Sequence, residues 1–405
     1  MVMLDRFPGL ERPDEAGRPY VHADAAGGTH VCEGVLAAMT DCLRRTNVNP
    51  NRPHPLSREA ADMLTDARAH FGRFADADAA GVVFGPNATS LTWHFARAFE
   101  RELEPGDVIV CTELDHEANV APWLAIAQRR GAGVRFVRLD PLTYETDLGS
   151  LDAAVDERTR LVAFTRASNL TGTVVPPEPF VAAARAVGAL TYADAVHAAP
   201  HLPLRQRELG IDVQVCSPYK FFGPHMGVLA LRPDVLDRLA PDRVRPAPTS
   251  GARRWEMGMP SLEAVAGLRA ALRYMETVGY DAIAEYERWL TLRALQRLGD
   301  IPQVRLHGRE TADDRTPTFA LSVADRTPTE VAVHLAHQGI LVSAGTNHAL
   351  ETIRALELDE KLGVVRIGFV HYHPLSDVDR VFSALAGAAQ AWSRPQTSQQ
   401  PRLVR

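Results

Sequence analysis

The sequence contains almost no lysine. Of its 44 basic residues only Lys220 and Lys361 are lysines, and the other 42 are arginines. Any chemistry that needs a side-chain amine is therefore confined to two positions. Charges of the two signs nearly balance, with a formal net charge of −6 at pH 7, so the composition offers no basic surface for nucleic acid or for an anionic membrane.

Cysteine and long apolar runs are also scarce. The four cysteines form no Cys-x-x-Cys pair and have no zinc-ligand spacing with histidine: Cys32, Cys42, Cys111 and Cys216. This argues against a metal site or a disulfide framework and is typical of reduced thiols in a cytoplasm. No apolar run reaches about 18 residues, and residues 1–12 lack the apolar core of a signal peptide, so we expect a soluble cytoplasmic protein.

The length of 405 residues exceeds what one hydrophobic core usually organises, so two domains are expected. In the first two thirds, short strand patterns alternate with helical periodicity, which predicts an α/β domain with a mostly parallel sheet covered on both faces. The strands are expected at 81–85, 107–112, 134–139, 161–167, 189–195 and 213–217, with a further, antiparallel candidate at 227–231. The helices are expected at 91–103, 118–130 and 179–187.

The rest of the chain predicts a smaller α+β domain. A mostly helical segment at 262–298 leads into strands at 318–323, 340–342 and 364–369 and helices at 328–337 and 376–392. The expected organisation is an N-terminal segment at 1–30, a large α/β domain at 31–270, a small domain at 271–392 and a disordered tail at 393–405, which is polar and contains two prolines.

Two polar residues follow neighbouring strands of the predicted sheet. One strand ends at Asp194, and the next leads to Lys220 within Tyr-Lys-Phe-Phe-Gly-Pro. Ligands of open parallel sheets bind beyond the carboxyl ends of the strands, so both side chains should face one crevice. A buried lysine amine can bond to the aldehyde of pyridoxal 5'-phosphate, and an acid can keep its ring nitrogen protonated. The alternative is a solvated lysine near a structural acid.

These motifs, with others in the same order, resemble the class V aminotransferase fold (fold type I) and, within it, the cysteine desulfurase-like family. The resemblance runs over about residues 20–391. It implies pyridoxal phosphate as the cofactor, a large domain with a mostly parallel sheet, a smaller C-terminal α+β domain, an amino-acid substrate and a homodimer.

The resemblance also implies roles for individual residues. His116 would stack on the cofactor ring and move protons, although a histidine that only caps a turn is the alternative. The segment 85–90 would hold the phosphate at a helix start, although an ordinary asparagine N-cap has the same sequence. The further cofactor contacts implied are Asn87, Ala88, Thr89, Asn169, Ser217, Tyr219 and His197, which replaces a more usual glutamine. The substrate contacts implied are Arg366 for the α-carboxylate, Asn169, and His54, for which a turn histidine without a role is the alternative.

Besides His197, the chain departs from this family at two further positions. Cysteine desulfurases carry a mobile-loop cysteine that accepts sulfur as a persulfide. The corresponding segment 343–350 reads Ser-Ala-Gly-Thr-Asn-His-Ala-Leu, with His348 at that position. Cys111 and Cys216 are expected to be buried strand residues. Met259 stands where a threonine usually reaches the phosphate of the neighbouring subunit, which leaves that contact open.

The reaction expected is loss of a proton from the Cα of an α-amino acid, with Lys220 as the base. Because the loop cysteine is missing, we favour β-elimination of a sulfur-bearing amino acid, with His348 as an acid to the leaving group, over persulfide transfer. A transaminase, an epimerase and a non-catalytic partner protein remain alternatives. The sequence identifies neither the natural substrate nor a sulfur acceptor.

Overall fold

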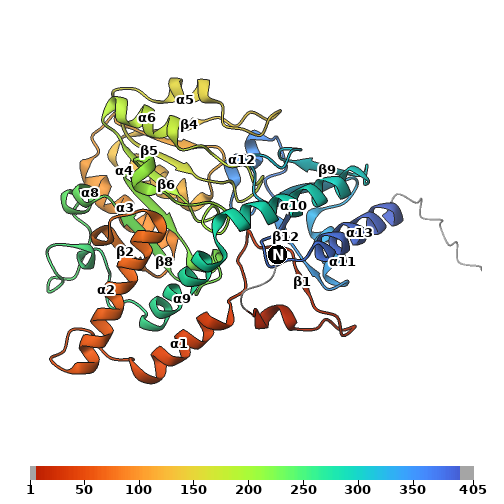
Figure 1. The fold of residues 1–405 in the computed structure, drawn as a ribbon. Coiled ribbons are helices and arrows are strands. Elements are labelled where there is room, and N and C mark those ends of the chain that lie inside the picture. The colour runs from red at the N-terminus through yellow and green to blue at the C-terminus, as the bar shows by residue number, and fades with distance from the viewer. Residues whose placement is uncertain (1–5, 393–405) are drawn as a thin grey trace, which may run out of the picture.

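The computed structural model describes residues 6–392, and the predicted tail at 393–405 lies outside them. Its large domain is built on a seven-stranded sheet in the order β2-β8-β7-β6-β5-β3-β4 (Figure 1). The strands β3 to β7 pair in parallel, whereas β8 is antiparallel to both of its neighbours. Their bounds are Val82–Gly85 (β2), Val108–Thr112 (β3), Gly133–Val137 (β4), Thr159–Thr165 (β5), Leu190–Asp194 (β6), Val213–Cys216 (β7) and Gly227–Leu231 (β8).

Helices cover both faces of this sheet because successive strand side chains point to opposite sides. In β3, Ile109 and Cys111 join the apolar cluster formed with α3 and α4, whereas Val108 and Val110 join the cluster formed with α5 and α6. The helices α1, α2 and α9 bury a third cluster beside β2 and β8. Their bounds are Glu33–Arg45 (α1), Pro55–Ala75 (α2), Ala88–Phe99 (α3), Ala121–Arg130 (α4), Leu148–Ala154 (α5), Glu178–Val187 (α6) and Leu262–Val278 (α9).

The small domain is an antiparallel four-stranded sheet in the order β12-β13-β10-β9, packed against helices α10, α11 and α13. Its strands are Val304–His307 (β9), Thr318–Val323 (β10), Ser343–Gly345 (β12) and Val364–Gly368 (β13). Its helices are Tyr280–Gly299 (α10), Pro328–Ala336 (α11), Leu350–Ala355 (α12) and Leu375–Trp392 (α13). A separate parallel pair joins β1 (Val21–His22) to β11 (Ile340–Leu341), so the N-terminal segment is tied to this domain (Figure 1).

The predicted fold class is confirmed, including the antiparallel pairing of β8. The segment 262–298 is mostly helical, as predicted, and Gly279, with a φ of 79°, divides it into α9 and α10. The strand predicted at 340–342 is present as β11, which pairs with β1 and not with the main small-domain sheet. One local prediction was wrong. The first residues of the predicted loop 343–350 form β12, which pairs with β13. The domain limits near 30 and 270 remain predictions.

The helices α1, α2, α5 and α12 and the strand β9 were not expected from the sequence. Within residues 6–392, no helix combines the length and apolar character needed to span a bilayer. The same part of the chain holds no cluster of three or more His, Cys, Asp or Glu side chains suited to a metal ion.

Candidate active site

One pocket lies at the carboxyl ends of the parallel strands and collects every residue predicted to contact the cofactor. The lining residues predicted from the sequence are Asn87, Ala88, Thr89, His116, Asn169, Asp194, His197, Ser217, Tyr219 and Lys220. Four further residues line it without having been predicted: Ala118, Thr165, Ala167 and Val196. Three of these are apolar and the Thr165 hydroxyl donates to Ala167 O at 2.8 Å, so composition and spacing give no signal for them.

Lys220 and Asp194 face this pocket from neighbouring strand ends. Lys220 closes a short 3-10 turn, Pro218–Lys220, that follows β7, and Asp194 is the last residue of β6. Burial lowers the pKa of the Lys220 amine to about 7, and the Arg366 charge adds to this effect. Burial raises the pKa of Asp194 to about 6, against the opposing effect of the Val196 N–H and of Lys220. The amine is therefore available in its neutral form near pH 7, while the acid remains mostly ionised.

The Lys220 amine is oriented by the N-terminal segment. Its Nζ donates a hydrogen bond to the carbonyl of Ala26 and lies 5.1 Å from the centroid of the Tyr219 ring. The same segment binds the lysine turn through Thr29, whose N–H donates to Tyr219 O at 2.9 Å and whose Oγ1 accepts from Phe222 N at 2.8 Å. These contacts fix a turn in which Phe222 adopts a left-handed φ of 69°.

The start of α3 forms the end of the pocket that suits an anion. Asn87 is the N-cap of this helix and accepts the Ser90 N–H at 2.7 Å. The amides of Ala88 and Thr89 belong to the first turn, where a helix has no internal acceptor for them, and both residues line the pocket. Gly227 lies directly beneath, since a Cβ there would come within 2.4 Å of the Asn87 backbone. This close approach brings the turn onto β8.

His116 both caps a turn and lines the pocket, so the two interpretations of this residue describe one arrangement. Its Nδ1 accepts the Ala118 N–H at 3.0 Å. Burial, with help from the nearby His348, lowers the pKa of the ring to about 3. The imidazole is therefore neutral at pH 7, and its proton resides on Nε2. Asp115 holds the corner before it through Thr112 and Asn119, a role that the sequence did not indicate.

His197 is fixed by the small domain. Its Nε2 lies 3.1 Å from Thr316 Oγ1 and 3.2 Å from Thr318 Oγ1. Complete burial lowers the pKa of this ring well below its usual value, so it is neutral. The two threonines were not predicted, because their contact with a residue some 120 positions earlier depends on how the domains pack.

Arg366 lies on β13 with its side chain only 6% exposed. Its Nη1 donates to Asn169 O at 3.2 Å, and its Nε and Nη2 both donate to Asp24 Oδ1, at 3.1 and 2.8 Å. The Asn169 side chain in turn donates to Asn347 O at 2.8 Å, and its own Oδ1 is buried without a partner in the structure. Hydrogen bonds thus join the Arg366 guanidinium, Asn169 and the segment 343–350 beside the pocket.

His348 and His54 lie outside the set of residues that line the pocket. The ring of His348 is exposed and its centroid lies 5.2 Å from that of His116, while its carbonyl accepts the Glu117 N–H at 2.7 Å. Asn347 and His348 both have positive φ, 53° and 57°, and so form a constrained turn. His54 is the exposed N-cap of α2 and accepts the Ser57 N–H at 3.2 Å. The roles of both histidines stay predictions.

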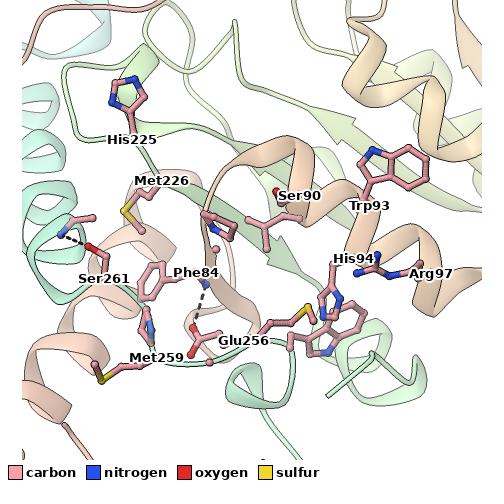
Figure 2. Close-up of a pocket in the computed structure, with 18 residues that line it drawn as sticks. Phe84, Ser90, Trp93, His94, Arg97, His225, Met226, Glu256, Met259 and Ser261 are labelled. Carbon is pink, nitrogen blue, oxygen red and sulfur yellow. Dashed lines mark hydrogen bonds between the residues drawn. The ribbon is translucent and has the colours of Figure 1, made fainter. Parts of the chain in front are cut away.

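A second cavity, of about 510 Å³, borders the same β2–α3 turn through Gly85, Pro86 and Ser90. Figure 2 shows Met226 and Met259 at this cavity and the hydrogen bond from Phe84 N to Glu256, which measures 3.1 Å. Met257 and Met259 are 69% and 59% exposed at its rim, although Trp255 beside them is buried. The cavity is largely apolar and contains no lysine.

All four cysteines are buried and form no disulfide, and none lines the pocket. The prediction that Cys111 and Cys216 are strand-interior residues is confirmed, since they lie in β3 and β7. Burial raises the pKa of both thiols well above the usual value, which disfavours the reactive thiolate.

The residues present fit pyridoxal phosphate. An enclosed amine, a buried carboxylate and an exposed helix start converge on one pocket of an α/β domain that carries a smaller α+β domain. The unpaired Asn169 Oδ1 shows that polar capacity at the pocket is left for a ligand. These features define a pyridoxal-phosphate-dependent enzyme of fold type I.

The chain belongs to the class V aminotransferase family, whose model, described as Aminotransferase class-V, matches residues 21–381. It is 32% identical over 410 residues to the probable cysteine desulfurase 2 of Mycobacterium leprae, covering 96% of both chains. It is 33% identical over 362 residues to a probable cysteine desulfurase of Streptomyces coelicolor, covering 84% of this chain and 85% of that protein. The protein is therefore a cysteine desulfurase-like enzyme that depends on pyridoxal phosphate.

A solved structure agrees with this fold. The apo cysteine desulfurase from Thermococcus onnurineus NA1 matches with a TM-score of 0.89 and 23% identity, covering 96% of this chain and 100% of that chain. At this identity the likeness supports the architecture and carries nothing about substrate.

Proposed function

We propose that the protein is a C–S lyase that removes the Cα proton of a sulfur-bearing amino acid such as cysteine and eliminates the β-substituent without a loop persulfide. The observation that carries this proposal is the segment 343–350. It contains no cysteine and places the ring centroid of His348 5.2 Å from that of His116, while every thiol of the chain is buried elsewhere.

We expect N–H donors at one end of the pocket and the Asp194 carboxylate at the other to hold the cofactor. The Ala88 and Thr89 amides, with Ser217 and Tyr219, would hold the phosphate, and Asp194 would keep the ring nitrogen protonated. His116 would stack on the ring, and His197 and Asn169 would donate to the ring oxygen. When bound through Lys220, pyridoxal phosphate would supply an electron sink that stabilises negative charge at the substrate Cα.

Two groups of this chain handle protons. Lys220 is the base that takes the Cα proton, because burial gives its amine a pKa of about 7 and hence a neutral form at working pH. His348 is the acid that gives a proton to the departing sulfur, since its ring is exposed and borders His116. His116 is neutral and stays in place through its bond to the Ala118 N–H.

The substrate is oriented through its carboxylate. Arg366 presents several N–H donors in a fixed fork, which is the geometry that a carboxylate accepts. Asn169 and His54 are the further substrate contacts that we propose. Asn169 is suited to this role because it already joins Arg366 to the loop 343–350.

The decisive experiment is incubation of the holoprotein with L-cysteine, L-cystine and a panel of other amino acids. Release of sulfide or of pyruvate supports the lyase. A turnover that needs an added keto acid identifies a transaminase, and α-deuterium exchange in heavy water without either product identifies an epimerase. A purified protein that takes up no pyridoxal phosphate identifies a non-catalytic partner protein.

We also propose a cytoplasmic homodimer. Four cysteines without a disulfide suit a reducing compartment. The apolar cavity beside the β2–α3 turn and the exposed Met257 and Met259 are the surface that a second copy would cover. Light scattering tests this proposal: a wild-type dimer that becomes a monomer in Met259→Glu supports it, and a wild-type monomer contradicts it.

A further inference from the structure

The guanidinium of Arg366 already holds a carboxylate of its own chain. Asp24 Oδ1 accepts two of its hydrogen bonds, from Nε at 3.1 Å and from Nη2 at 2.8 Å, although the two residues are 342 positions apart. The edge of the guanidinium formed by Nε and Nη2, one of those through which arginine grips a carboxylate in a bidentate pair, is therefore occupied. A third donor, Nη1, is used by the Asn169 carbonyl.

When no substrate carboxylate is present, the buried Arg366 guanidinium needs another counter-ion, and Asp24 supplies it. The Arg366 side chain is only 6% exposed, and a buried cation without a counter-ion is strongly disfavoured. A substrate carboxylate placed beside the intact pair would put two anions around one cation, and the like charges would repel each other. The pair is thus compatible with one carboxylate at a time on this edge.

Asp24 is the partner that can move. Its side chain is 31% exposed, whereas Arg366 is anchored within β13 between β12 and β10. The Asp24 carboxylate also occupies the space over Gly27, where an added Cβ would lie 2.3 Å from Oδ2. Gly27 does not have positive φ, so the missing side chain, and not an unusual backbone, is what makes room for the carboxylate.

We propose that Asp24 is a specificity-determining residue, an internal carboxylate that competes with the substrate carboxylate for Arg366. This inference rests on the proposed function, in which Arg366 binds that group. Asp24 must swing away from the guanidinium before the substrate is clamped, so a substrate is selected by how well its carboxylate replaces Asp24. The empty site stays neutralised and closed to weakly bound carboxylates.

The test measures carboxylate binding directly. Propionate carries the carboxylate but no amine, and its Kd for the holoprotein is measured by ligand-detected NMR titration, alongside KM and kcat for L-cysteine. Asp24→Asn keeps the shape and removes the charge. We expect it to lower the Kd of propionate and the KM about five- to tenfold, with kcat changed by less than about twofold. An unchanged or weaker Kd would overturn the proposal, because Asp24 would then only position Arg366.

Two further variants test the same proposal, so that it does not depend on Asp24→Asn alone. Gly27→Ala places a methyl group where the Asp24 carboxylate lies, so it should displace that side chain and lower the Kd in the same direction. Asp66→Asn removes an equal charge from the ion pair between Asp66 on α2 and Arg269 on α9 and should leave the Kd unchanged. If Gly27→Ala folds and binds propionate no better than wild type, competition by Asp24 is excluded.

Arg366→Gln separates the two proposals. Wild-type affinity for propionate in Arg366→Gln would mean that Arg366 does not bind the carboxylate, and the proposed function would lose its substrate clamp. Loss of binding in Arg366→Gln without any gain in Asp24→Asn would leave that clamp intact and remove only the role of Asp24.

Discussion

Asp194 and Lys220 face each other across one pocket because β6 and β7 run in parallel and each residue lies at or just beyond the end of its strand. Burial moves their pKa values in opposite directions, to about 6 for the acid and about 7 for the amine. Desolvation therefore keeps the amine partly neutral at pH 7, and the acid stays mostly ionised despite desolvation because its raised pKa is still below 7. In the proposed function, the cofactor chemistry depends on this pair.

Replacement of Lys220 should abolish covalent attachment of the cofactor. Lys220→Ala removes the only amine in the pocket, so the yellow absorbance of the holoprotein should vanish and borohydride reduction should add no mass. Lys361→Ala is the matched control, since Lys361 is the only other lysine and is exposed. Retention of the absorbance in Lys220→Ala would contradict the assignment.

Asp194→Asn should slow turnover by about a hundredfold or more, because an amide cannot balance the positive charge of a protonated ring nitrogen. Asp194 is buried, so water has little access to the position of the lost charge. The measurement is kcat at saturating cofactor, together with cofactor occupancy from absorbance. Normal kcat at full occupancy would show that the acid is only structural.

A cysteine-free variant should still turn over. All four thiols are buried, and burial raises the pKa of Cys111 and Cys216. Replacement of all four by alanine should leave kcat within about threefold of wild type once the folded fraction is corrected for. A loss of sulfide release with folding intact would mean that one of these thiols carries sulfur, and the elimination route would fail.

His348→Asn should uncouple proton abstraction from elimination. Asparagine tolerates the positive φ of this position, so the backbone turn is retained while the imidazole is lost. We expect about a tenfold lower rate of sulfide or pyruvate release, with α-deuterium exchange unchanged. Equal losses in both rates would assign His348 to an earlier step.

The buried amine should make the stability of the apoprotein depend on pH. The pKa of Lys220 falls from 10.5 in the unfolded chain to about 7 in the folded one, so between pH 7 and pH 10.5 the unfolded chain binds more protons. Stability should therefore rise with pH across this window. Lys220→Met removes the effect, so its advantage over wild type, on the order of a few kcal/mol at pH 7, should shrink towards pH 10.

Chemical denaturation at a series of pH values measures this difference. Lys361→Met is the control for removal of an exposed lysine. An advantage of Lys220→Met that is independent of pH would mean that the amine is not desolvated in the folded protein.

The strand order along the chain was predictable because buried strands leave short apolar runs separated by amphipathic helices. The helices α1 and α2 were not predicted, since their apolar faces are defined by packing on α9. The division of 340–345 between β11 and β12 was missed for a similar reason. Two strands in a row can be told apart only by their partners, β1 and β13.

The residues of the site divide in the same way into those that the sequence predicted and those that it did not. Lys220, Asp194 and the helix start at Asn87 were found because reactive groups at strand ends leave a local pattern. Asp115 and Thr316 leave no such pattern. Their importance lies in hydrogen bonds to the corner before His116 and to His197, which exist only in the folded chain.

By itself the sequence determined the chemistry that is available: two amines, no loop thiol and an alternation of strands and helices that forms a doubly covered sheet. These properties depend on residue type and local periodicity, which the chain carries in any conformation. Only the tertiary structure decided that Asp24, from the N-terminal segment, neutralises Arg366 on β13. An ion pair between residues 342 positions apart is formed by the packing of the domains, and no local pattern encodes it.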